Sequence, residues 1–517
     1  MKKSILLLVG VLFISSSYSQ DITDALRYSQ DEIQGTARFR ALSGAFGALG
    51  GDMSAVSINP AGSAIFNSSH ISFTLSNLNK KNKTQYFEGF DSASNSNINF
   101  NQAGAAFVFN NSNPESDWKK FVLSVSYDNI QDYDNDWFAH GTNSNSIDGY
   151  FLYYANGLGL EPPQGLPLIE ISAFPGESYS EAYLEIGYAN GFGHQQAFLG
   201  YESFILEPES NTDENTVYTS NIAAGDFQQE YAYVSTGYNG KFTFNAATQY
   251  KDKLYLGINL NSHFISYLRY THLLENNNNI DTNISTPIKL VDFDNNLSTF
   301  GSGFSFQLGG IFKLSDDFRI GVTYNSPTWM TIREETTQDI TTVREDTGTN
   351  VNQYINPLII NVFPRYDLQT PGKFTGSLAY IFGDRGLISF DYSLKDYSNT
   401  KFKQTYDSYF SAQNNIISNS LTTVSSYKVG GEFRHKELSF RGGYRLEESP
   451  YKNGQTVGDL TGYSLGLGYN FGKAKLDITY DHAERSNQHQ LYSVGLTDVV
   501  TIDSKSNNVT MSLSFNL

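Results

Sequence analysis

A period-two alternation of apolar and polar side chains repeats from about residue 70 to the C-terminus. Leu254, Leu256, Ile258 and Leu260 alternate with Tyr, Gly and Asn, and the last residues, 509–517, follow the same pattern. Successive side chains of a β-strand point to opposite faces, so each such stretch predicts a strand with one apolar and one polar face. The chain is therefore predicted to be all-β from residue 70 onward.

Fourteen such stretches are separated by turn residues. The predicted strands are residues 70–79, 97–110, 119–137, 231–250, 253–275, 297–314, 317–335, 368–382, 386–398, 419–435, 437–449, 458–472, 474–486 and 505–517. The connections at 111–118, 251–252, 315–316, 383–385, 436 and 473 are short, and those at 80–96, 138–230, 276–296, 336–367, 399–418, 450–457 and 487–504 are mostly long. Short and long connections alternate strictly along the chain.

This arrangement predicts a membrane-spanning antiparallel β-barrel of about 14 strands. Bacterial outer-membrane barrels combine an even strand number with short periplasmic turns, longer extracellular loops and two periplasmic termini. The sheet must close, because no water in the bilayer core can satisfy a sheet edge. A soluble sandwich or propeller is the alternative, but it does not require one set of turns to be short. We expect an outer-membrane protein of a Gram-negative bacterium, surrounded by outer-membrane lipid and lipopolysaccharide.

The first nineteen residues are typical of a secretory signal peptide. Lys2 and Lys3 precede an apolar run at 5–14, and small residues at 17–19 predict cleavage before Gln20. The run is shorter than the roughly 20 apolar residues of a helical span, so a transmembrane anchor is the weaker alternative. The sequence has no cysteine, which excludes disulfides and a lipoprotein anchor.

The composition fits side chains that are apolar only at alternate positions. The chain has 35 Tyr, 37 Phe and 44 Gly, and its mean hydropathy is −0.37. No strongly hydrophobic segment follows residue 19, which excludes a helical membrane protein. The net charge is −18, or −20 without Lys2 and Lys3, which argues against nucleic acid as a partner.

Residues 20–69, which precede the predicted barrel, are rich in glycine and other small residues. Residues 43–52 read SGAFGALGGD and residues 54–66 read SAVSINPAGSAIF. A segment this short cannot bury a core of its own, but it can pack inside a barrel lumen, where glycine permits close backbone approach. We therefore predict three parts: a signal peptide at 1–19, an N-terminal hatch that plugs the lumen at 20–69, and the barrel at 70–517.

These stretches resemble the N-terminal hatch of the FadL/TodX family of outer-membrane transporters for long-chain fatty acids and other hydrophobic compounds. Residues 228–231 and 253–257 look like the variant of that family common in Bacteroidetes. The resemblance implies that extracellular loops capture a hydrophobic small molecule in a groove, and that a shift of the hatch opens a passive path, in some members sideways through the wall. The hatch residues it implies are Gly44, Phe46, Gly47, Gly50, Gly51, Asp52, Asn59, Pro60, Ala61 and Gly62. A plug with a purely structural role is the alternative.

The longest predicted connection, 138–230, is unusually aromatic. Residues 150–154 read YFLYY, and the spacing of Tyr183, Ile186 and Asn190 predicts a short helix. An exposed apolar patch of this kind indicates a binding surface, and a cap packed on itself over the barrel mouth is the alternative. The sequence identifies no single ligand-binding residue in this loop.

Few residues indicate a metal site or a catalytic site. His482 and His489 straddle a loop and do not predict a metal site, and the polar stretches at 276–281 and 292–295 are expected to be solvated loops without EF-hand spacing. No nucleophile motif is present, so no catalytic residue, metal or cofactor is expected.

The predicted function is therefore passive, hatch-gated uptake of a hydrophobic small molecule such as a long-chain fatty acid. A surface adhesion barrel, whose extracellular loops hold a macromolecule, is the alternative. The last strand places Phe515 and Leu517 on one face, which resembles the signal read by the barrel assembly machinery, a further expected partner.

Overall fold

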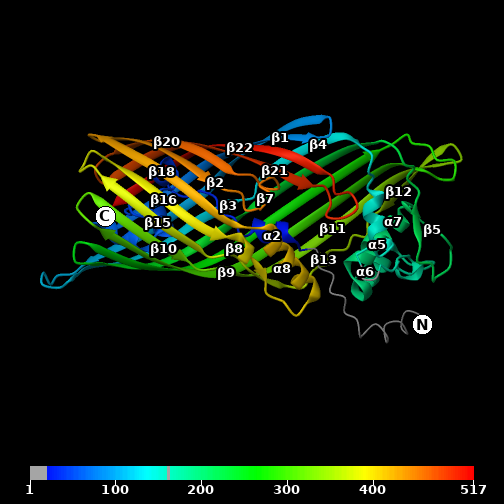
Figure 1. Cartoon of the computed structure of the whole chain (residues 1–517), viewed down its shortest axis with the longest axis horizontal. Coiled ribbons are helices and arrows are strands. Elements are labelled where there is room, and N and C mark those ends of the chain that lie inside the picture. The colour runs from blue at the N-terminus through cyan, green and yellow to red at the C-terminus, as the bar shows by residue number, and fades with distance from the viewer. Residues whose placement is uncertain (1–19, 160–162) are drawn as a thin grey trace.

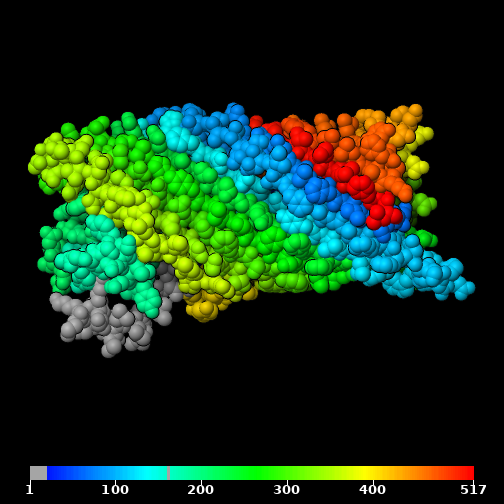
Figure 2. Space-filling view, turned by 180° about the vertical axis from the view of Figure 1, so that it is seen from behind, coloured from blue at the N-terminus to red at the C-terminus, as the bar shows by residue number. Residues whose placement is uncertain are grey.

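A computed structural model describes residues 20–159 and 163–517, so the predicted signal peptide at 1–19 lies outside the described residues. One antiparallel sheet forms the wall of a barrel and closes on itself, because β1 (His70–Tyr86) pairs with β22 (Val499–Asn516). Figure 2 shows these first and last strands side by side on the outer wall, in blue and red.

Fourteen wall strands, three of them made of two consecutive segments, form the barrel, which confirms the predicted fold. Between β1 and β22 they are β2 (Gly89–Asn110), β3 (Trp118–Asp132) continued by β4 (Asn135–Asn143), β7 (Phe227–Tyr250), β8 (Leu254–Asn276), β9 (Ile288–Lys313), β10 (Phe318–Asn325) continued by β11 (Trp329–Asp346), β15 (Lys373–Ile381) continued by β14 (Tyr366–Gln369), β16 (Gly386–Asp396), β18 (Thr423–His435), β19 (Leu438–Glu447), β20 (Leu460–Asn470) and β21 (Ala474–Gln490). Short strands β5 (Leu206–Pro208), β6 (Tyr218–Ser220), β12 (Thr349–Ile355), β13 (Asn361–Val362) and β17 (Lys401–Phe402) lie in the long connections.

In residues 20–159 and 163–517, helices occur in three places. The N-terminal segment has α2 (Ile22–Arg27), α3 (Ala37–Ala41), α4 (Met53–Ile58) and the 3-10 helix η2 (Pro60–Ile65). The connection between β4 and β7 has α5 (Asp148–Ala155), η3 (Leu168–Glu170), α6 (Tyr179–Asn190) and α7 (Phe192–Glu202), and η4 (Tyr397–Asn399) and α8 (Ser408–Ser420) follow β16. No helix in the described ranges combines the length and apolarity needed to cross a membrane.

The alternation seen in the sequence places apolar side chains on the outside of the wall. Leu256, Ile258 and Leu260 of β8 are exposed, whereas Asn259 and Asn261 between them are buried toward the lumen. The same pattern recurs around the barrel, so the outer surface is apolar and the lumen is lined by Ser, Thr, Asn and Asp. Such a wall suits a lipid exterior and a polar interior.

The short and long connections lie at opposite ends, as Figure 1 shows. The C-terminus lies at the end with the short turns, and α5, α6 and α7 gather at the other end. The predicted loops at 276–296 and 336–367 are shorter than expected, since β9 begins at Ile288 and β11 continues to Asp346. The predicted loop at 80–96 is wrong: these residues belong to β1 and β2, which meet in a tight turn at Phe87 and Glu88. These strand residues are mostly Asn, Ser, Lys and Thr, because a strand that extends beyond the lipid needs no apolar face.

Candidate functional site in the barrel lumen

Residues 20–69, called the plug here, lie inside the barrel and are largely buried. Helix α2 packs in an aromatic cluster with wall residues such as Tyr267 and Tyr366. Helix α3 contacts β19 to β22, and η2 contacts β3, β7, β8 and β9, so the plug touches strands from opposite parts of the wall. The plug therefore closes the lumen across its width.

The two predicted hatch motifs fold against each other. The amide of Gly51 donates to the carbonyl oxygen of Gly62 at 3.0 Å. The side chain of Asp52 caps α4 by accepting from the amide of Ser54 at 2.9 Å, and it also accepts from the hydroxyl of Thr36 at 2.7 Å. These local bonds make one compact unit from two halves of the segment.

Asn59 joins this unit to the wall. Its Nδ2 donates to the carbonyl oxygens of Gly47 at 2.7 Å and of Gly310, on β9, at 3.1 Å. Its Oδ1 accepts from the amide of Ala61 at 3.1 Å, which caps η2 with Pro60 at the first position, where a missing amide hydrogen costs nothing. One side chain thus holds a turn, a helix start and a barrel strand together.

Phe46 and Gly47 are held by a wall carboxylate. Both amides donate to Oδ2 of Asp391 on β16 at 3.0 Å. The Phe46 ring is fully buried and lies 5.6 Å from the Phe39 ring, and Gly44 has a φ of +77°, which allows the turn between them. The predicted hatch residues are thus brought together, and wall residues such as Asp391 are brought to them.

Glycines on the inner face of the wall form sockets for the plug. A Cβ atom at any of seven wall glycines would lie within 3 Å of a plug atom: Gly104, Gly257, Gly309, Gly321, Gly430, Gly443 and Gly466. Several of these approaches are to plug backbone, for example 2.2 Å to the carbonyl oxygen of Gly47 from Gly321 and 2.4 Å to the carbonyl carbon of Pro60 from Gly257. Part of the high glycine content therefore serves the fit between wall and plug.

Two arginines of α3, which the sequence analysis did not single out, anchor the plug by charge. Arg40 donates from Nε and Nη2 to the two carboxylate oxygens of Asp481 at 2.7 and 2.9 Å. Arg38 donates from Nε to Glu432 at 2.9 Å, and Arg441 binds the same carboxylate. Arginines in a stretch of small residues were the available signal, but their carboxylate partners lie about 400 residues away in the sequence.

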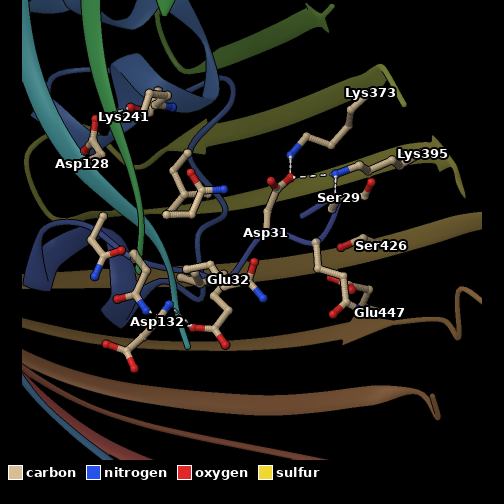
Figure 3. A pocket seen from close by; sticks show the side chains of 18 of the residues that line it. Ser29, Asp31, Glu32, Asp128, Asp132, Lys241, Lys373, Lys395, Ser426 and Glu447 are labelled. Carbon is tan, nitrogen blue, oxygen red and sulfur yellow. Dashed lines mark hydrogen bonds and ion pairs between the residues drawn. The ribbon is translucent and has the colours of Figure 1, made fainter. Parts of the chain in front are cut away.

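A cavity of about 290 Å³ lies between the plug and the wall. Most of its lining side chains are polar or ionisable, and Figure 3 shows several of the ionisable ones. The cationic residues are Arg40, Lys80, Lys241, Lys373, Lys395, Lys428, Arg445 and Arg485, and the acidic residues are Asp31, Glu32, Asp128, Asp132, Asp134 and Glu447. We call this cavity the chamber; its lining is more polar than a site for a purely apolar molecule requires.

The chamber borders a part of the wall where the backbone hydrogen-bond ladder between β2 and its neighbour β3 is interrupted. Strand β2 pairs with β3 only over residues 102–110, although β2 continues to Gly89. Beyond that point three asparagine side chains bridge to aspartates instead of a backbone ladder: Asn95 to Asp136, Asn97 to Asp134 and Asn99 to Asp132. Several of these side chains line the chamber. The wall is therefore held there by side chains alone.

A cap, residues 144–159 and 163–226, covers the barrel mouth. The helix predicted near residues 183–190 is α6, and Tyr183 and Ile186 are buried in a large cluster with α5 and α7. The cap is thus packed on itself through most of its aromatic side chains. Leu184 and Tyr188 nevertheless remain exposed, at 53% and 86%.

The groups considered for metal binding are arranged differently from the prediction. His482 bonds to Asn507, whereas His489 packs against Trp137, so they form no joint site. Residues 292–295 are not a loop but part of β9, where a strand beyond the lipid alternates polar residues. Among the residues the structure describes, His272, Asp292 and Asp294 bring ligand atoms within 4.8 Å of one another.

A family model and solved structures of known proteins agree on one family of outer-membrane transport proteins. The family model described as outer membrane protein transport protein (OMPP1/FadL/TodX) matches residues 206–517. A FadL homologue of Pseudomonas aeruginosa has a similar structure at 10% identity, with a TM-score of 0.52, covering 94% of this chain and 99% of that one. The toluene transporter TodX of Pseudomonas putida matches at 11% identity and a TM-score of 0.50, with 94% and 99% covered. No curated protein matches by sequence.

Proposed function

The chain belongs to the OMPP1/FadL/TodX family of outer-membrane transport proteins, and on this premise we propose that it admits hydrophobic small molecules, such as long-chain fatty acids, by passive passage gated by the plug. Membership places the chain in the outer membrane of Gram-negative cells and among transport channels, in agreement with the prediction that it is not an enzyme. The substrate and the gating step are the parts proposed here.

The observation that carries the proposal is the chamber beside the interrupted ladder. A molecule that reached the chamber would find β2, before residue 102, joined to the neighbouring strand by side-chain bonds such as the three Asn–Asp bridges, without a backbone ladder. Separating side-chain bridges disrupts no backbone ladder, so a sideways exit into the membrane would leave the rest of the barrel intact. This supports lateral release in preference to passage through the plug.

An apolar patch at the long-loop end supports capture of the ligand from outside the cell. Helix α6 exposes Leu184 and Tyr188, and the cap is joined to the segment 354–363 by the bonds of Tyr183 and Gln195 to Asn361. That segment exposes Leu358, Ile360 and Val362 at 82%, 60% and 61%. Exposed apolar side chains in such number favour a binding surface.

The remaining assignments follow from this orientation. Both termini would be periplasmic, with the short turns. The exposed side chains of Phe515, on the last strand, and of Leu517, just after it, would be read by the barrel assembly machinery, and lipopolysaccharide would surround the opposite rim. The ten predicted hatch residues would hold the plug in its closed position, because they make its internal bonds and its bonds to Asn245, Asp391 and Gly310.

Two measurements test the proposal. Deleting residues 36–66 is expected to leave a folded barrel with a raised leak in planar bilayers; unchanged conductance would exclude gating by the plug. Organic extraction of the purified protein, followed by mass spectrometry, is expected to find a hydrophobic molecule that is absent from the deletion variant. An empty barrel in both samples would favour the adhesion alternative.

A further inference from the structure

Part of the plug differs from the rest in how it is held. Residues 28–34, called the strap here, connect α2 to α3 without helix or strand and border the chamber. Its backbone bonds to the wall through the amide of Glu32, which donates to the carbonyl oxygen of Ile130 at 3.1 Å, and through the carbonyl oxygen of Ser29, which accepts from Lys395. Residues 36–66, by contrast, sit in glycine sockets and carry the arginine anchors. The strap is therefore the part of the plug that would break the fewest bonds to the wall if it moved.

A two-lysine clamp holds the strap at its centre. Oδ2 of Asp31 lies 3.1 Å from Nζ of Lys373 on β15 and 3.2 Å from Nζ of Lys395 on β16. Lys395 also donates to the carbonyl oxygen of Ser29 at 2.5 Å, as Figure 3 shows. Burial alone would raise the pKa of Asp31, but the two ammonium groups hold it well below its usual range. The clamp is thus an ion pair at neutral pH.

The clamp has spare positive charge. Lys428 on β18 lines the same chamber, and within the described ranges it has no hydrogen bond and no carboxylate at ion-pair distance. The side chains of Lys395 and Lys373 are only 11% and 23% exposed, so they would be costly to leave without an anion. Asp31 is 45% exposed toward the chamber and can be approached from it. A second carboxylate could therefore take its place while the lysines stay neutralised.

We propose that Lys373, Lys395 and Lys428 form a binding site for the carboxylate head group of an amphiphilic ligand, and that Asp31 is the internal counter-ion that the head group displaces. The inference rests on the proposed function and adds to it how the ligand releases the strap. Apolar side chains at the chamber edge, Met330, Tyr397 and Val424, offer a surface for the first part of the tail. An uncharged hydrophobe of the same length cannot replace Asp31, so it leaves the strap in place.

The test compares laurate with dodecanol, which has the same chain length but no charge. Calorimetric titration of the full-length protein in a nonionic detergent gives both affinities, and heat-modifiable gel migration confirms that each variant is a folded barrel. Asp31→Asn is expected to strengthen laurate binding about fivefold, because the displaced Asp31 carboxylate is itself half-exposed, and to leave dodecanol binding unchanged. Glu32→Gln is the matched control, since Glu32 lines the same chamber without contacting either lysine.

The double substitution Lys373→Gln with Lys395→Gln is expected to abolish the preference for laurate and to keep dodecanol binding. Unchanged or weaker laurate binding by Asp31→Asn, or a laurate preference that survives loss of both lysines, would overturn the head-group site while leaving the transport proposal intact. If neither the native protein nor Asp31→Asn bound either probe, the transport proposal would fall as well.

Discussion

A single methyl group in a wall socket is expected to loosen the plug. Gly257 on β8 faces η2, and a Cβ there would lie 2.4 Å from the carbonyl carbon of Pro60 and 2.5 Å from the amide nitrogen of Ala61. Both are backbone atoms, so no side chain can rotate away. Gly257→Ala therefore requires η2 to shift from the wall or the strand to bend.

The size of the effect follows from the contacts that a shift breaks. Overpacking by one group costs about 1–3 kcal/mol. A shift of η2 also stretches the bond from Asn245 Nδ2 to the carbonyl oxygen of Pro60, now 2.9 Å, which contributes about 1 kcal/mol. Together these weaken docking of the plug by roughly 2–4 kcal/mol, which raises the undocked fraction roughly 30- to 1,000-fold.

Hydrogen exchange of the amides in residues 36–66 measures this directly, because their protection reports the free energy of opening. Gly310→Ala is the matched control: Gly310 is on the outer face of β9, and its nearest contact would be an ordinary 3.7 Å to Leu256. Gly257→Ala should lose protection across the plug and leak more in planar bilayers, and Gly310→Ala should do neither. Equal protection in the two variants would refute the socket argument.

Two further perturbations act on single sites. Asp391→Ala removes the acceptor of the Phe46 and Gly47 amides, which costs about 1–3 kcal/mol for each buried amide left unpaired. Hydrogen exchange at residues 44–48 should therefore accelerate. The acceleration should be smaller in Asp391→Asn, which keeps one acceptor oxygen. Glu275, at the long-loop end of β8, binds Ser146 and Ile147 of the cap, and burial raises its pKa from 4.5 to about 7. Because the docked cap favours the protonated acid, docking should be strongest below pH 4.5, weaken up to about pH 7 and then stay constant. Proteolysis of the cap at pH 5 and pH 8 should show this difference, and Glu275→Gln should abolish it; a cap equally resistant at both pH values would contradict the assignment.

Strand alternation was sufficient to predict the barrel, because a lipid exterior and a polar lumen impose opposite polarities on neighbouring residues. Leu254 to Leu260 show this within one strand. The rule failed at residues 80–96, where both faces of the hairpin are polar and the apolar signal disappears. In the plug, the resemblance singled out Asn59, Pro60 and Gly62, whose bonds within the plug span only a few residues of the chain.

The sequence by itself thus determined the fold class, the strand number and the segment that packs inside the lumen, all of which follow from patterns of neighbouring residues in the chain. Only the tertiary structure decided what the plug touches. Arg40 meets Asp481, and Asp31 meets Lys373 and Lys395, across separations of more than 340 residues. No sequence periodicity encodes such pairs, because closure of the barrel brings strands that are distant in the chain around one lumen. The clamp, the glycine sockets and the chamber therefore exist only once the barrel has closed.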